Sequence, residues 1–174
     1  MRARAWHTIA GMIGPRSVHP DEWVPGDYRV AAAVNRQREY FEEHFGFRFW
    51  DDSEEGIGEF KVAGCLTSNN RQFKLTQYLA ALTDKIEIDV LYFKESMTRD
   101  LEDILIDLEL DCADLYWVHE AITLASYDVW RQDDNGNRYL VSADVCRPDA
   151  MRLMQRLEST KHKQTYWVAQ HQPQ

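Results

Sequence analysis

The chain has 174 residues, of which 44% are hydrophobic and 12% aromatic, so it has enough apolar side chains for a packed core and its composition argues against disorder. No run of about 18 apolar residues occurs, which argues against a transmembrane helix. The short apolar stretch after Met1 is interrupted by polar residues and lacks the features of a signal peptide, so we expect a cytoplasmic protein.

Acidic side chains are concentrated in the middle third of the chain. Between Asp84 and Glu120 there are twelve acids and three bases, which account for the whole net charge of −9, and the other residues balance to zero. Seven acids occur from Asp100 to Asp114 with no base among them. A field of one sign attracts a positively charged partner and repels phosphate, so we expect a basic protein partner and no direct binding of nucleic acid. A solvated acidic helix face without a partner is the alternative.

The first part of the chain is predicted to contain one helix and two strands. Residues 1–27 have several turn signals and no periodicity, which is typical of an irregular N-terminal arm. Apolar residues near helical spacing predict a helix from Val30 to Phe45. Strands are predicted at 47–50 and 59–66, on either side of an acidic turn at 51–56.

Two further helices and a strand are predicted in the acidic region. The first helix is expected from Asn70 to Leu82, and the strand from Lys85 to Phe93, where apolar and acidic residues alternate. The second helix begins at Ser96 or Thr98, although residues 106–111 alternate and could also form a strand. Acids at steps of three or four residues predict one continuous outward ridge on this helix, formed by Asp100, Asp103, Asp107 and Asp111.

The C-terminal part has the clearest signals, after an ambiguous aromatic segment at 112–124. Two β-prone runs at 127–132 and 138–145 are joined by a turn containing Asn135-Gly136, a strong hairpin signal because both residues tolerate positive φ. A helix from Pro148 to Glu158 and a strand at 163–169 complete a ββαβ unit.

These elements predict an α+β fold in which helices pack on a mixed or antiparallel sheet. The chain divides into an irregular arm (1–27), an acidic α+β region (28–121) and a C-terminal ββαβ unit (122–174). No linker rich in Gly, Ser or Pro separates the last two, so we expect them to form one compact domain.

No catalytic or metal-binding motif is found in the sequence. The three widely spaced cysteines (Cys65, Cys112 and Cys146) do not suggest a disulfide framework or a metal site, and we expect small buried hydrophobic residues. His119, beside Glu120, is the best candidate for proton transfer, but no nucleophile or second base accompanies it. We therefore prefer to interpret His119 as a half-buried histidine that is hydrogen-bonded to a carboxylate. We therefore assign no catalytic residue, no metal and no cofactor.

The size, acidity, aromatic content and missing catalytic set are similar to those of bacterial toxin-immunity proteins. The resemblance implies an acidic binding protein that neutralises a basic partner, such as a nuclease-like toxin. The alternatives are a DNA mimic that blocks a restriction or CRISPR complex, an enzyme using His119 and Glu120, and a purely structural or regulatory module. The predicted partner-binding residues are the clustered acids with two aromatic neighbours as anchors, namely Asp100, Asp103, Asp107, Asp111, Asp114, Tyr116 and Trp117.

Overall fold

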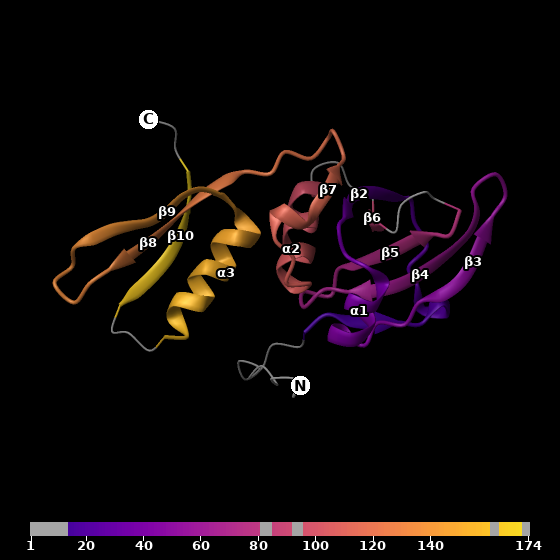
Figure 1. Cartoon of the computed structure of the whole chain (residues 1–174), viewed down its shortest axis with the longest axis horizontal. Helices are drawn as coiled ribbons and strands as arrows, with labels where there is room; N and C mark the ends of the chain where they lie inside the picture. The colour runs from indigo at the N-terminus through magenta and orange to yellow at the C-terminus, as the bar shows by residue number, and fades with distance from the viewer. Residues whose placement is uncertain (1–13, 81–84, 92–95, 161–163, 172–174) are drawn as a thin grey trace.

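The computed structural model describes residues 14–80, 85–91, 96–160 and 164–171. These residues form two antiparallel sheets arranged along the long axis of the molecule, with helix α2 (Met97–Asp107) between them (Figure 1). Three α-helices and ten strands are found in the described part, which confirms the α+β class.

The larger sheet has the strand order β1-β4-β5-β6-β2-β7, and β3 pairs with β4 on the edge that also carries β1. All of its pairings are antiparallel. Its strands are β1 (Arg16–Val18), β2 (Tyr28–Val34), β3 (Trp50–Glu54), β4 (Gly58–Leu66), β5 (Gln72–Tyr78), β6 (Ile86–Leu91) and β7 (Leu115–Val118).

The main hydrophobic core lies on one face of the larger sheet, under α2 and α1 (Arg38–Phe45). Side chains at spacings of three and four on α2 are fully buried there, among them Leu101 and Leu105. Each such side chain contributes roughly 1.5–3 kcal/mol by leaving water. Phe41 of α1 is buried in the same core.

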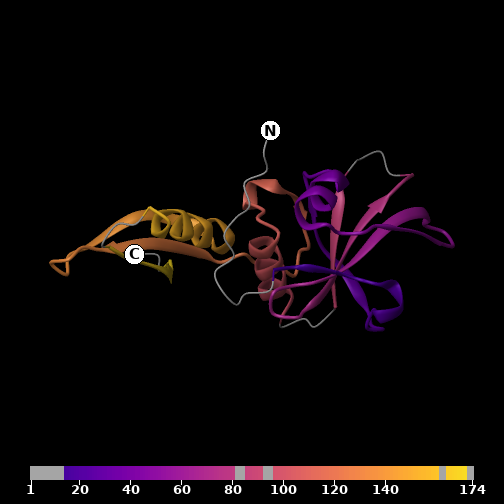
Figure 2. The same ribbon diagram turned by 90° about the horizontal axis from the view of Figure 1, so that it is seen from below.

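The smaller sheet has the order β10-β8-β9 and is covered on one face by α3, as Figure 2 shows. Its elements are β8 (Ser126–Gln132), β9 (Arg138–Cys146), α3 (Arg147–Glu158) and β10 (Thr165–Gln170). The predicted ββαβ unit and its hairpin are therefore confirmed. The turn differs from the expected one, because Gly136 has a positive φ (83°) and Asn135 does not. Val129 and Ala150 are fully buried between sheet and helix.

Two predicted helices are wrong because pairing within the sheet overrides the local pattern. Residues 28–34 form β2, in the interior of the larger sheet, and only 38–45 of the predicted helix are helical. Residues 72–78 form β5, whose buried residues Phe73 and Leu75 follow a period of two. Residues 81–82, where that helix was expected to end, lie outside the described part of the chain.

The other elements agree with the sequence in kind and differ at their ends. One exception is the strand expected at 47–50, which is wrong apart from Trp50: residues 47–49 are not strand, and β3 takes up residues 51–54 of the expected acidic turn. The helix predicted to begin at Ser96 or Thr98 is confirmed as α2, and the competing strand at 106–111 is wrong. Within the expected irregular arm the structure has β1 and a short 3-10 helix, η1 (Pro20–Glu22), while residues 1–13 are outside the described ranges. No helix of the described part is long and apolar enough to cross a membrane.

Candidate functional site

The predicted acidic ridge of α2 does not face outward as one surface. Asp100 is only 7% exposed; its carboxylate accepts a hydrogen bond from Ser96 Oγ (2.7 Å) and contacts the guanidinium of Arg71. The side chain therefore closes the start of α2 against the loop before β5. The expectation of an outward ridge is wrong at this position.

The next acids along α2 face the C-terminal unit. Asp103 lies 2.6 Å from Nη1 of Arg147, at the start of α3, and 3.3 Å from Nε of Arg99. Glu102 is 3% exposed, and one of its carboxylate oxygens lies 3.7 Å from the same guanidinium group. Burial raises the pKa of Glu102, although the two arginines oppose that shift. These contacts join α2 to α3.

The three remaining predicted acids are also held by nearby groups. Asp107 accepts hydrogen bonds from the backbone nitrogen (2.6 Å) and the hydroxyl (2.9 Å) of Ser68. Asp111 contacts Arg152 of α3, and Asp114 lies 2.8 Å from Nη2 of Arg36. Arginines from both ends of the chain thus neutralise much of the acidic cluster. In the structure these acids make contacts within the protein, and their role in partner binding remains a prediction.

The two predicted aromatic anchors are accessible. Tyr116 is 61% exposed and Trp117 is 45% exposed, on the edge strand β7. Lys85 Nζ lies 5.0 Å from the centre of the Tyr116 ring, at cation–π distance. Both rings are therefore exposed enough to contact a partner, but Lys85 already lies against the ring of Tyr116.

His119 is used locally. Its Nδ1 atom accepts a hydrogen bond from the backbone nitrogen of Ala121 (3.0 Å), and its ring lies edge-on to Trp117. Glu120 is exposed beside it. His119 is half-buried and hydrogen-bonded, as a structural histidine would be, but its partner is a backbone nitrogen and not the expected carboxylate.

An exposed acidic hairpin was not recognised as a site from the sequence. All nine residues from Asp51 to Glu59 are exposed; five of them are acids and none is a base. The segment includes most of β3, the turn and the start of β4, and it extends from the edge of the larger sheet (Figure 1). Lys61 on β4 contacts Asp51, and the other four acids keep the segment strongly negative. The sequence showed that acids are dense in this segment, but it did not show that the segment forms a projecting hairpin.

A shallow hollow of about 340 Å³ lies at the base of this hairpin. Its lining combines an acidic side with an apolar side, and consists of Asp51, Asp52, Ser53, Glu59, Phe60 and Leu79. Leu79 is 49% exposed, and the Phe60 ring lies 5.6 Å from the ring of Tyr78. Lysine and arginine have an apolar stem and a charged end, and a hollow of this composition suits both parts.

Charged groups are also partly buried on the sheet face opposite α2. Asp89 is 8% exposed and accepts a hydrogen bond from the Thr76 hydroxyl (2.5 Å). Burial raises the pKa of Asp89. Burial also raises the pKa of Glu87, and the negative charge of Asp89 adds to this effect. Lys74 Nζ lies 4.0 Å from the ring centre of Tyr28, and burial lowers its pKa. Perturbed groups often mark functional sites, but Asp89 is already held by Thr76, and these side chains line neither the hollow beside the β3–β4 hairpin nor the one around Gln72 and Leu91.

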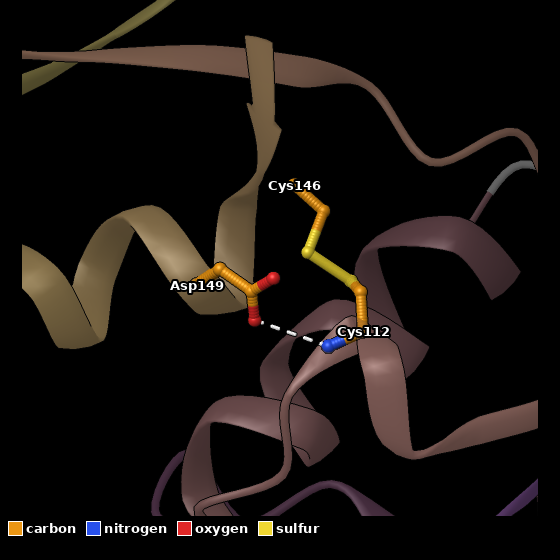
Figure 3. A group of neighbouring side chains, drawn as sticks. All are labelled: Cys112, Cys146 and Asp149. Carbon is orange, nitrogen blue, oxygen red and sulfur yellow. Dashed lines mark hydrogen bonds between the residues drawn. A yellow bond between two sulfur atoms is a disulfide. The ribbon is translucent and has the colours of Figure 1, made fainter. Parts of the chain in front are cut away.

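Two cysteines form a disulfide between the two sheet regions, which the sequence did not predict. Cys112 follows α2 in the 3-10 helix η2 (Cys112–Asp114), and Cys146 ends β9 at the N-cap of α3. Figure 3 shows Asp149 beside the bond, with its carboxylate accepting a hydrogen bond from the backbone nitrogen of Cys112 (3.0 Å). The expectation of buried, unpaired cysteine is wrong for this pair because the fold brings distant residues together. It agrees with the structure for Cys65, which is buried and free.

The sulfurs and the Asp149 carboxylate lie within 4.8 Å of one another, as metal ligands would. The two sulfurs are bonded to each other, however, and metals require thiolates, so this state is not a metal centre. Burial raises the pKa of Asp149, and Asp111 adds to the effect.

Comparison of the chain with family models, with curated proteins and with solved structures finds no match.

Proposed function

We propose that this is a binding protein that engages a positively charged protein partner through the hairpin β3–β4. The observation that supports the proposal is the run of nine exposed residues, Asp51 to Glu59, with five carboxylates and no base. Their field speeds the approach of a basic surface and rejects an acidic one. The hairpin replaces the α2 acids as the main acidic contact, because arginine and serine groups hold those acids within the fold.

The hollow beside the hairpin suggests how the contact is made. A lysine or arginine of the partner would lay its stem on Phe60 and Leu79 and bring its charge to the carboxylates of Asp52 or Glu59. Partial removal of water by the apolar side strengthens such an ion pair relative to one on an open surface. Tyr116 and Trp117 lie on the opposite edge strand of the sheet, so a role for them requires a partner that also reaches β7.

The particular partner class that we propose is a toxin or other basic enzyme with a cleft for phosphate, which makes the protein an inhibitor of the toxin-immunity type. The hairpin would enter that cleft and occupy the place of the nucleic-acid backbone. A projecting β-hairpin suits this role, because its length allows carboxylates to reach a recessed basic surface.

Reversal of three hairpin charges tests the proposal. The variant Asp52→Lys/Glu54→Lys/Glu55→Lys is compared with a control that has the same charge change at scattered exposed acids, Glu22→Lys/Glu43→Lys/Glu158→Lys. The partner is first captured from the native host on wild-type protein, eluted with salt and identified. Its association rate with each variant is then measured at low and high salt.

We expect the hairpin variant to associate at least about tenfold more slowly at low salt, with the difference shrinking at high salt, because steering is screened. The control variant should lie much closer to wild type. Equal rates for the two variants would show that net charge matters and the hairpin does not. Circular dichroism should confirm that both variants are folded, since exposed substitutions change stability by about 0.5 kcal/mol or less each.

A further inference from the structure

We propose that Cys112 and Cys146 form a reversible thiol–disulfide site, which a small-molecule disulfide closes and a small-molecule thiol opens in the folded protein, with Asp149 as a positioning residue. The site does not depend on the hairpin or on its partner. It joins the segment after α2 to the start of α3, and so connects the regions of the two sheets (Figure 3).

The surroundings of the bond allow exchange without unfolding. Both cysteines are half-buried, whereas Cys65 is buried in the core. The junction also has other contacts that remain when the disulfide opens, namely the ion pairs of Arg147 with Asp103 and of Arg152 with Asp111. The opened protein therefore keeps the two thiols near each other.

The two cysteines are not equivalent. Cys146 occupies the N-cap of a helix of 12 residues, where the helix dipole favours a thiolate. Cys112 is at the start of a single 3-10 turn and lacks a comparable helix. Cys146 is thus the attacking thiolate in closing, and Cys112 is the resolving residue.

The chemistry balances with one external disulfide, for example oxidised glutathione. The Cys146 thiolate attacks one sulfur of that disulfide and forms a mixed disulfide, and the first external thiolate leaves. The Cys112 thiolate then attacks the Cys146 sulfur and expels the second. Two electrons pass from the protein cysteines to the external disulfide, and the two protein thiol protons end on the two thiols released.

Asp149 holds the resolving cysteine in place. Its carboxylate is in the first turn of α3 and accepts the hydrogen bond from the Cys112 backbone nitrogen, which fixes the two residues across the junction. A contact of this kind raises the effective concentration of one thiol at the other, and hence the equilibrium constant for closing. Asparagine at this position keeps an accepting oxygen and alanine does not.

The experiment equilibrates the full chain in mixtures of reduced and oxidised glutathione, traps free thiols by alkylation and locates them by peptide mass. We expect the pair to open in reduced glutathione and close again in oxidised glutathione, with an unchanged circular dichroism spectrum. Asp149→Ala should lower the equilibrium constant for closing about tenfold, as loss of one hydrogen bond predicts, and Asp149→Asn should stay within about twofold of wild type. Cys112→Ser should accumulate a mixed disulfide at Cys146 faster than Cys146→Ser does at Cys112.

Three results would overturn the inference. A bond that opens only after denaturant unfolds the chain is a permanent structural bridge. Equal equilibrium constants for wild type and Asp149→Ala remove the positioning role. Stoichiometric binding of Zn²⁺ by the reduced protein, strong enough to prevent closing by oxidised glutathione, identifies a metal site in place of a redox pair.

Discussion

Arg147 is the most consequential single cation at the junction of α2 and α3. It is 14% exposed and contacts Asp103 and the buried Glu102, so Arg147→Ala leaves two carboxylates without this charge in a poorly solvated place. We expect a loss of about 2–4 kcal/mol in the free energy of unfolding, measured with urea at pH 7. Arg99→Ala is the matched control, because Arg99 contacts the same Asp103 but is 57% exposed, and it should cost about 1 kcal/mol or less.

The cost of Arg147→Ala should depend on pH in a definite direction. Burial already raises the pKa of Glu102, and loss of the guanidinium removes an opposing effect. As the pH falls through the pKa of Glu102 in the variant, the carboxyl takes up a proton and the penalty for a buried charge disappears. The difference from wild type should therefore shrink in acid; a difference that grows there would contradict the assignment.

Asp89 offers a second test of charge burial on the larger sheet. Its pKa is raised in the folded state, so the folded protein binds a proton more readily there than the unfolded chain does, and this residue makes the protein less stable as the pH rises through that pKa. Asp89→Asn keeps an oxygen for the Thr76 hydroxyl and removes the charge. We expect stabilisation of roughly 1 kcal/mol at pH 7, which vanishes below about pH 3.9, the ordinary pKa of aspartate. The exposed Asp134→Asn is the control and should change the free energy of unfolding at pH 7 by about 0.5 kcal/mol or less.

Residue-level roles were the hardest to read from the sequence. Arg99 is the single base within α2, and the preponderance of acids around it predicted a free ridge. Their cations come from remote segments, Arg71 for Asp100 and Arg147 for Asp103, and only the fold brings each pair together. A local charge count cannot detect such pairs.

The close approach of the N-terminal arm to β4 is a feature of elements and not of single residues. A Cβ atom at Gly64 would lie 1.9 Å from Nε1 of Trp23, whose indole also donates a hydrogen bond to the carbonyl of Val18 (3.2 Å). The arm from β1 through η1 thus packs on the sheet where the strand has no side chain. This explains why glycine is needed in the interior of a strand, where it otherwise weakens the structure.

A double-mutant cycle measures that packing. Gly64→Ala should cost about 1–3 kcal/mol in the free energy of unfolding, because the indole must move. Trp23→Ala should remove the obstruction, so that adding Gly64→Ala to it costs at least about 1 kcal/mol less than in the wild-type background. Urea unfolding of the four proteins gives the coupling. Simple additivity would mean that the indole does not rest on Gly64.

Elements with strong local signals were predictable, and elements defined by their neighbours were not. The hairpin of β8 and β9 has Asn135-Gly136, and α3 has a proline in its first turn, so both were identified. β2 and β5 were mistaken for helices. Ala31, Ala32 and Ala33 have no strong strand preference, and they become a strand because β6 and β7 pair with them on either side.

At the scale of the whole molecule, the fold class followed from the sequence but the connection between its regions did not. Cys112 and Cys146 are 34 residues apart, and no spacing rule pairs two of three cysteines at such distances. Their pairing depends on the position of α3 against α2, which is set by ion pairs that the sequence also concealed. The disulfide and the ion pairs were therefore missed for the same reason, because both depend on how α3 packs against α2.

The disulfide should contribute to the stability of the whole chain through the unfolded state. A closed loop of this length restricts the unfolded chain by an amount worth about 4 kcal/mol at most, and measured effects usually fall below that limit. We expect Cys112→Ala/Cys146→Ala to be about 2–4 kcal/mol less stable than the oxidised protein. The ion pairs of Arg147 and Arg152 remain, so the variant should still fold.

Urea unfolding with and without dithiothreitol measures this contribution and provides its control. Reductant should lower the midpoint of the wild-type protein nearly to that of the variant, whose own midpoint should not respond. The dependence of the free energy on urea should become steeper when the bond is absent, because an unfolded chain without the loop exposes more surface. If the variant matched the oxidised protein in both midpoint and slope, the covalent link would add nothing to the contacts of α2 with α3, and those ion pairs alone would hold the two regions together.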